Sequence, residues 1–202
     1  MATLLSQVEY MREYARNCPD FVMTKWLLRS AIEFCHQTRY YRETIIVPTV
    51  AETEFYDLEA SNPNAEVFGI QAAEFKGVPL TQGAPEEQPQ VDGIPRYFWY
   101  LPTQEIALTP TTREDADDDL AVNVLLKPIE NATELDDELL REFGEAIRAG
   151  ALRRILTMPK TAWRDDNEAS NQAAIERRGH DNARWKADTQ HRTADFVTLP
   201  GF

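Results

Sequence analysis

The hydrophobic periodicity of this chain changes twice along its length, and this constrains the possible fold more than any other feature. Apolar residues follow helical spacing up to about Arg42. Short β-prone runs separated by Pro, Gly or Asn fill the middle, and helical spacing returns after Thr133. This order predicts an α+β fold in which a strand module is inserted into a helical bundle closed by both chain ends. We expect a helical domain from residues 1–42 plus 133–190, an inserted β domain from residues 43–132, and a C-terminal docking tail at residues 191–202.

Two helices are expected before the strands. The first should cover Ala2 to Arg16, and the second should run from Phe21 to about Thr38 with Asp20 as its N-cap. The second helix has apolar residues that cover a broad face, for which core packing is the main interpretation: Val22, Trp26, Leu27, Ala31, Ile32, Phe34 and Cys35.

A third helix is predicted after Thr133, with the acidic residues 136–138 at the positive end of its dipole and Pro159 beyond its end. It carries a stripe at 3.6-residue spacing: Leu140, Phe143, Ile147, Ala151, Ile155 and Met158. This stripe should pack against Trp26, Leu27, Ala31 and Ile32. Gly144 and Gly150 lower helix propensity, which suggests that another backbone approaches there.

Short runs in the middle are predicted to form six or seven strands of a small antiparallel sandwich or barrel: 44–47, 54–58, 66–75, 78–80, 96–101, 105–108 and 120–126. Leu120, Val122, Val124 and Leu126 should share one face, and Lys76-Gly77 should form a hairpin tip. The polar loop at residues 81–95 is interpreted as a projecting interaction loop, with simple mobility as the alternative.

The formal net charge of −13 is concentrated in the middle of the chain, where residues 51–130 include 16 acidic and 4 basic side chains. This balance argues against sequence-specific nucleic-acid binding. The acidic surface could repel DNA, meet a basic partner or keep the protein soluble.

Searches for catalytic and cofactor motifs lead us to expect no enzyme, no cofactor and no metal site. The glycines form no phosphate-binding motif, and the three histidines are scattered. The run from Glu114 to Asp119 fails as a calcium loop, because Leu120 and Leu126 replace the required Gly and Glu, and a solvated hairpin loop is preferred. The aromatic run Tyr97–Tyr100 is read as a buried strand, because basic residues are scarce around it.

The sequence contains neither a secretory leader pattern nor a run of eighteen apolar residues, so we expect no membrane association. Cys18 and Cys35 are isolated, which favours reduced thiols in a reducing cytosol.

Two stretches carry a resemblance to a known family. Residues 17–38 include Ala31-Ile32-Glu33-Phe34-Cys35 before Thr38, and residues 145–159 read Glu-Ala-Ile-Arg-Ala-Gly-Ala-Leu-Arg-Arg-Ile-Leu-Thr-Met-Pro. Both resemble hallmark helices of bacteriophage head-to-tail adaptor proteins, the connector or tail tubular protein A-like family. The resemblance implies a homo-oligomeric ring, typically of twelve subunits, beneath the portal protein in the neck of the virion. Such a ring is assembled in the host cytoplasm, surrounds the passing genomic DNA and provides the platform for tail or nozzle proteins.

The end of the chain suits such an assembly. A polar helix is predicted from Glu168 to about Gln190, followed by an apolar tail with no helix to bury it. We therefore place the portal or subunit interface, as a hypothesis, at Arg177, Arg178, Trp185, Phe196, Val197, Leu199 and Phe202. The rival interpretations are a small soluble oligomeric binding or regulatory module and an unrecognised enzyme.

Overall fold

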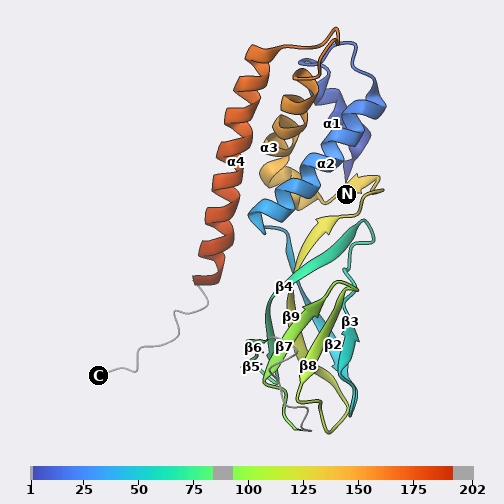
Figure 1. The fold of residues 1–202 in the computed structure, drawn as a ribbon, viewed down its shortest axis with the longest axis vertical. Helices are drawn as coiled ribbons and strands as arrows, with labels where there is room; N and C mark the ends of the chain where they lie inside the picture. The colour runs from blue at the N-terminus through green and yellow to red at the C-terminus, as the bar shows by residue number, and fades with distance from the viewer. Residues whose placement is uncertain (1, 84–92, 193–202) are drawn as a thin grey trace, which may run out of the picture. The chain divides into compact units, whose positions relative to one another are not determined.

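The computed structural model describes residues 2–83 and 93–192 and is mixed in class (Figure 1). Within these residues it contains four helices and two sheets of mainly antiparallel strands, together with a two-stranded pair. This confirms the predicted α+β class. The chain divides into two compact units, which are described separately below: the described parts of Met1–Tyr40 and Pro128–Phe202 form the helical unit, and Tyr41–Lys127 forms the β unit.

The helical unit begins with a short strand and a short helix. Strand β1 (Ala2–Thr3) pairs antiparallel with β10 (Glu134–Leu135), and α1 covers Leu4–Met11. The first helix was predicted too long at both ends. Strand pairing takes residues 2 and 3, and turns that include Asn17 at a φ of 67° separate α1 from the next helix.

Helix α2 (Asp20–Thr38) begins one residue earlier than predicted. Pro19 is its N-cap, and Asp20 forms an ion pair with Arg12 at 2.7 Å instead of capping the helix. The buried face is also rotated from the predicted one, because Val22, Trp26 and Ile32 are only half-buried. Its buried residues are Met23, Leu27, Ser30, Ala31, Phe34, Cys35 and Thr38.

Helix α3 (Asp137–Leu156) has the predicted acidic start and most of the predicted apolar stripe, but Met158 lies beyond its end and is half-buried. The Asp136 side chain accepts hydrogen bonds from the backbone N–H of Glu138 and Leu139 at 2.8 and 3.3 Å, so it caps the helix. Ile147, Ala151 and Ile155 are fully buried, whereas Leu140 is half-buried. The stripe contacts α2 directly, since the Ser30 hydroxyl donates to the Ile147 carbonyl oxygen at 2.7 Å and the Phe34 and Phe143 ring centroids lie 5.2 Å apart.

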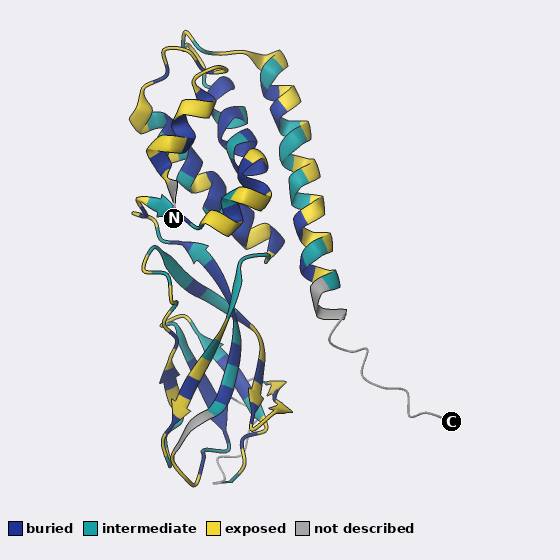
Figure 2. Ribbon diagram, turned by 180° about the vertical axis from the view of Figure 1, so that it is seen from behind, coloured by how far each residue is buried: buried dark blue, intermediate teal, exposed yellow. Residues whose placement is uncertain are grey.

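Helix α4 (Asp166–Arg192) is the longest helix of the described residues. The Asp165 side chain accepts hydrogen bonds from the backbone N–H of Asn167 and Glu168 at 3.1 and 3.0 Å, and these bonds fix the start of the helix. Figure 2 shows a narrow buried stripe along α4, with exposed and half-buried residues on its other sides.

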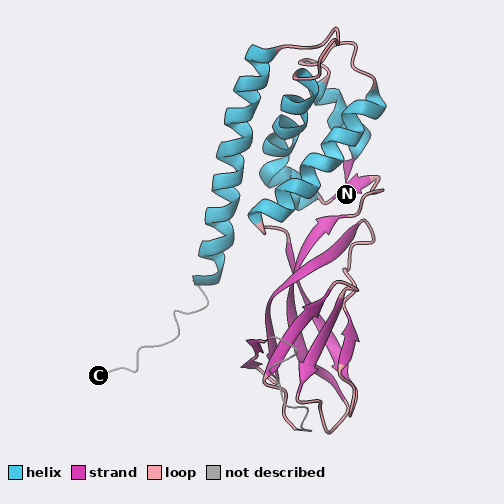
Figure 3. Ribbon diagram, viewed as in Figure 1, coloured by secondary structure: helices cyan, strands magenta, loops and turns pink. Residues whose placement is uncertain are grey.

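The β unit contains two four-stranded sheets (Figure 3). One has the order β2-β9-β4-β5 and the other β3-β8-β7-β6. The pairings β2–β9, β4–β5, β3–β8 and β7–β8 are antiparallel, and that of β6 with β7 is parallel. The strands are β2 (Arg42–Thr49), β3 (Phe55–Asp57), β4 (Ala65–Phe75), β5 (Val78–Pro79), β6 (Thr81–Gln82), β7 (Tyr97–Leu101), β8 (Glu105–Thr109) and β9 (Ala116–Pro128). Their inner faces share one apolar cluster, so the unit is a sandwich.

Strand β9 shows how closely alternation predicts burial. Leu120, Val122, Val124 and Leu126 are each at most 1% exposed, as their spacing predicts. The predicted hairpin is also confirmed: Phe75 pairs with Val78 across Lys76 and Gly77, whose φ values of 52° and 73° suit a tight two-residue turn.

Two predictions for the β unit need correction. The acidic run is not wholly a loop, because β9 begins inside it at Ala116, where Thr49 of β2 pairs with it. The loop expected from residue 81 begins later, because Thr81–Gln82 joins the second sheet. Residues 84–92, which make up most of that predicted loop, lie outside the described residues.

Candidate interaction surfaces

Helix α4 packs on its own unit through small side chains. Its buried residues are Ala169, Gln172, Ala183 and Ala187. Gly179 lies between them, and a Cβ there would be 2.2 Å from the Cβ of Ala146 on α3. The seam recurs every three or four residues, as in closely packed helix pairs, but it buries little apolar area.

Ion pairs join α4 to the other helices. Arg153 and Arg154 of α3 flank Glu176 of α4, with N–O distances of 2.5 Å from Arg153 and 3.5 Å from Arg154. Arg154 also pairs with Glu33 of α2, so one guanidinium connects three helices. Gly150 leaves room for this network, because a Cβ at that position would lie 2.8 Å from a Glu176 carboxylate oxygen.

An aromatic group adjoins the same seam. His180 of α4 meets the Phe34 ring edge-on at a centroid distance of 5.0 Å, and Phe34 in turn contacts Phe143. Burial lowers the pKa of His180 below its ordinary value, although Glu176 acts in the opposite direction. Further along, Lys186 of α4 pairs with Glu142 of α3.

The outward face of α4 carries the described part of the predicted interface. Arg177 and Arg178 are exposed and form no ion pair with any residue that the structure describes. Trp185 is 65% exposed, which is unusual for the largest apolar side chain. The other predicted interface residues, Phe196, Val197, Leu199 and Phe202, lie outside the described residues.

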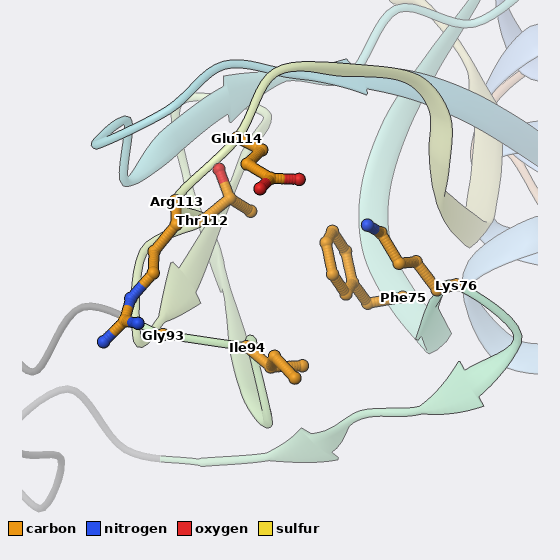
Figure 4. Close-up of a pocket in the computed structure, with 7 residues that line it drawn as sticks. All are labelled: Phe75, Lys76, Gly93, Ile94, Thr112, Arg113 and Glu114. Atoms are coloured by element: carbon orange, nitrogen blue, oxygen red, sulfur yellow. The ribbon is translucent and has the colours of Figure 1, made fainter.

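A shallow pocket of about 420 Å³ opens on the β unit (Figure 4). Its lining combines Phe75 and Ile94 with the charged residues Lys76, Arg113 and Glu114. Among the described lining residues, the Thr112 hydroxyl donates to the Val50 carbonyl oxygen at 3.0 Å, and Lys76 forms an ion pair with Asp119 at the same distance.

The two cysteines and the aromatic run considered in the sequence analysis include buried side chains. Cys18 and Cys35 are free and buried, and burial raises the pKa of both thiols, which keeps them protonated and unreactive. Among the side chains that the structure describes, which exclude those of residues 116–118 and 190–192, no group of three or more His, Cys, Asp or Glu could hold a metal ion. Of the strand Tyr97–Leu101, Phe98 and Trp99 are buried, as the sequence predicted.

None of the helices in the described part of the chain combines the length and apolar character of a membrane span. Comparison with protein-family models and with curated proteins gives no match.

The sequence reading missed the docked face of α4 and the ion network beneath it. The signal was present as Ala169, Gln172, Glu176, Gly179 and Ala183, whose spacing alternates between three and four residues. A search for large apolar residues does not find such a stripe, because the residues that pack there are small or polar.

Proposed function

We propose that this chain is a structural subunit of a bacteriophage particle, an adaptor in the ring that joins the portal of the head to the tail. The observation that carries the proposal is the outward face of α4, with exposed Arg177, Arg178 and Trp185. A helix that buries only a narrow seam of small residues and displays a tryptophan is suited to a second contact. Tryptophan and arginine are the residue types most enriched at the energetic centres of protein interfaces.

The helical unit is the proposed mount of this surface. Contacts of α2 with α3, including the Phe34–Phe143 ring pair, support a helical bundle closed by both ends of the chain. The ion network then holds α4 along this bundle. A ring subunit needs such a rigid mount, because its interfaces with two neighbours and with the portal must hold at the same time.

The β unit is proposed to face the DNA channel or the tail side. Of its charged residues, 16 are acidic and 5 are basic, and two of the basic ones form ion pairs, Lys76 with Asp119 and Lys127 with Glu66. The remaining carboxylates would repel the phosphates of passing DNA, so the duplex could slide without being held.

Electron microscopy of the purified protein mixed with its cognate portal tests the function. We expect a ring of twelve subunits below the portal around an open channel. The double variant Arg177→Glu/Arg178→Glu and the single variant Trp185→Ala should remain folded but lose portal binding. The matched control is Arg141→Glu, which changes an arginine whose side chain is 73% exposed on α3. A binding module that forms only small oligomers and ignores the portal would contradict the proposal.

Deletion of residues 194–202 tests the part of the interface that follows α4. The deleted protein should stay folded and soluble but fail to join the portal. Undiminished portal binding would remove the tail from the interface, and unfolding would assign the tail to the subunit's own core.

DNA binding provides an independent test of the acidic β unit. In an electrophoretic mobility assay at physiological salt, the isolated protein should not retard duplex DNA. Tight duplex binding would contradict the proposed role of its carboxylates.

A further inference from the structure

The two sheets of the β sandwich end in edge strands of different length. Strands β5 and β6 lie in different sheets and are separated by Leu80 alone, so the chain crosses directly between the sheets there. The opposite edges are β2 in one sheet and β3 in the other. Strand β2 has eight residues and β3 only three, so β2 is the long open edge of the described strands.

Hydrogen bonding to β9 determines which backbone groups of β2 face outward. The Leu126 N–H donates to the Tyr41 carbonyl oxygen at 2.9 Å, and the same register continues with Glu43 opposite Val124 and Ile45 opposite Val122. In an antiparallel ladder, hydrogen-bonded pairs alternate with pairs whose N–H and C=O groups point away. The backbone N–H and C=O groups of Thr44 and Ile46 therefore point away from β9, on the outer side of the strand.

This edge lacks most of the features that protect edge strands in monomers. Such strands usually carry an inward charge, a lysine, a proline or a bulge at their centre. Arg42 and Glu43 put charges at the start of β2, where the Glu43 carboxylate accepts hydrogen bonds from Ser61. The following stretch Thr44-Ile45-Ile46-Val47 is uncharged, and both Pro48 and the register shift after Val47 come at its far end. Ile46 is 50% exposed on the outer face. By contrast, the edge of β3 is short and includes Asp57.

We propose that β2 accepts residues 195–199 of a neighbouring copy as an added strand. Ten residues follow Arg192, and Asp195-Phe196-Val197-Thr198-Leu199 is a β-prone run that Pro200 ends. Its five residues are long enough to pair along the uncharged stretch Thr44–Val47. Main-chain hydrogen bonds to this stretch would supply affinity, and the apolar side chains of the added strand would cover Ile46.

The proposal deepens the proposed function, on which it rests for the presence of a neighbouring copy. It names the surface through which one subunit holds the next, and a head-to-tail contact of this kind can close into a ring. The test uses the full chain without portal, so a failure to bind portal and a failure of strand addition are observed separately.

Hydrogen exchange of the Thr44 and Ile46 amides, measured at increasing protein concentration, tests the proposal. We expect exchange at both amides to slow by about tenfold or more as copies associate. The tail double variant Val197→Pro/Thr198→Pro should abolish protection of both amides. Thr44→Pro, which removes an outward N–H and leaves the β9 ladder intact, should abolish it at Ile46, the one of the two amides that remains. Circular dichroism checks that each variant is folded.

Ile46→Lys supplies a second variant on the same edge, in case Thr44→Pro unfolds the strand, and it should also abolish protection. Its matched control is Val78→Lys, because Val78 is 62% exposed on the opposite edge of the same sheet. Three outcomes would overturn the proposal. In the first, the amides are unprotected at every concentration. In the second, protection does not depend on concentration, which indicates that the chain's own tail covers the edge. In the third, protection depends on concentration but survives the tail change, which indicates pairing of two β2 strands.

Discussion

In the β unit, fifteen buried residues from both sheets form one apolar cluster, whereas the helical unit places two arginines, two glutamates and a histidine between its helices. The sandwich is stabilised mainly by burial of apolar area, which is not directional. The attachment of α4 depends more on ion pairs and hydrogen bonds, which are directional and weaken steeply when their geometry changes.

The difference shows where each unit can tolerate change. An apolar cluster accepts substitutions of similar volume at modest cost. A seam of small residues and ion pairs does not, because it has little spare volume and because removing one charge leaves a partly buried partner charge behind. The α4 seam should therefore respond to substitutions that change almost no apolar area.

The largest expected effect is at Phe143, in the part of the helical unit that, like the sandwich, is held by packing of apolar side chains. Phe143 is 5% exposed, and its ring contacts those of Phe34 and Tyr40 at centroid distances of 5.2 and 4.6 Å. Phe143→Ala should lower the free energy of unfolding by about 3–5 kcal/mol, measured by urea denaturation. An unchanged melting temperature would contradict a core shared by α2 and α3.

The next effect tests the ion network. Glu176→Ala leaves Arg153 without its partner and Arg154 with Glu33 alone, and the Arg154 side chain is only 16% exposed. We expect a loss of about 1–3 kcal/mol. The control Glu138→Ala removes a 3.9 Å pair between side chains that are at least 70% exposed, so it should have little effect on the denaturation midpoint. Equal effects of the two changes would show that the network does not hold α4.

Two glycine substitutions separate tight packing from helix propensity. A Cβ at Gly179 would clash with Ala146, so Gly179→Ala should destabilise the helical unit by about 1–3 kcal/mol. At Gly144 the closest contact is the far end of the Arg148 side chain at 3.1 Å, which can move. Gly144→Ala should therefore stabilise the unit by up to about 1 kcal/mol. Thermal melts of both variants provide the comparison, and a stabilising Gly179→Ala would show that α4 can shift on α3.

The contrast between the units also explains what could be predicted from the sequence. Alternation in residues 120–126 and the Lys76-Gly77 turn are local signals, and the structure agrees with both. The apolar face of α2 was broad enough to be compatible with two orientations of the helix about its axis. Packing against α3 selects the orientation that buries Met23 and Ser30. The first residues of β9 are acidic, and their strand conformation depends on pairing with β2, which no local pattern indicates.

The candidate site was predictable only in part. The exposure of Arg177, Arg178 and Trp185 agrees with a polar helix that has a free face. Its docked face was not predicted, because alanine, glycine and glutamine do not form a hydrophobic stripe. Which groups of β2 face outward depends on the register with β9, a nonlocal property that a single sequence does not reveal.

The smallest expected effect is a dependence of helical-unit stability on pH. His180 packs against Phe34 of α2 and lies near Glu176, Asp181 and Arg184 of its own helix and Arg154 of α3. Burial lowers its pKa in the folded protein below the usual value of about 6.5, so the unfolded chain binds the proton first as pH falls. Stability should therefore be full above the unfolded pKa and decline as pH falls below about 7 toward the folded pKa.

Urea denaturation at about pH 7.5 and pH 5.5, followed by helical circular dichroism, measures this dependence. His180→Gln cannot take up the proton, so its midpoint should fall less between the two pH values than that of the parent chain. If His180→Gln and the parent chain lost the same stability between the two pH values, the seam would accommodate a charged imidazolium. The packing of α4 would then be less sensitive to charge than its contacts indicate.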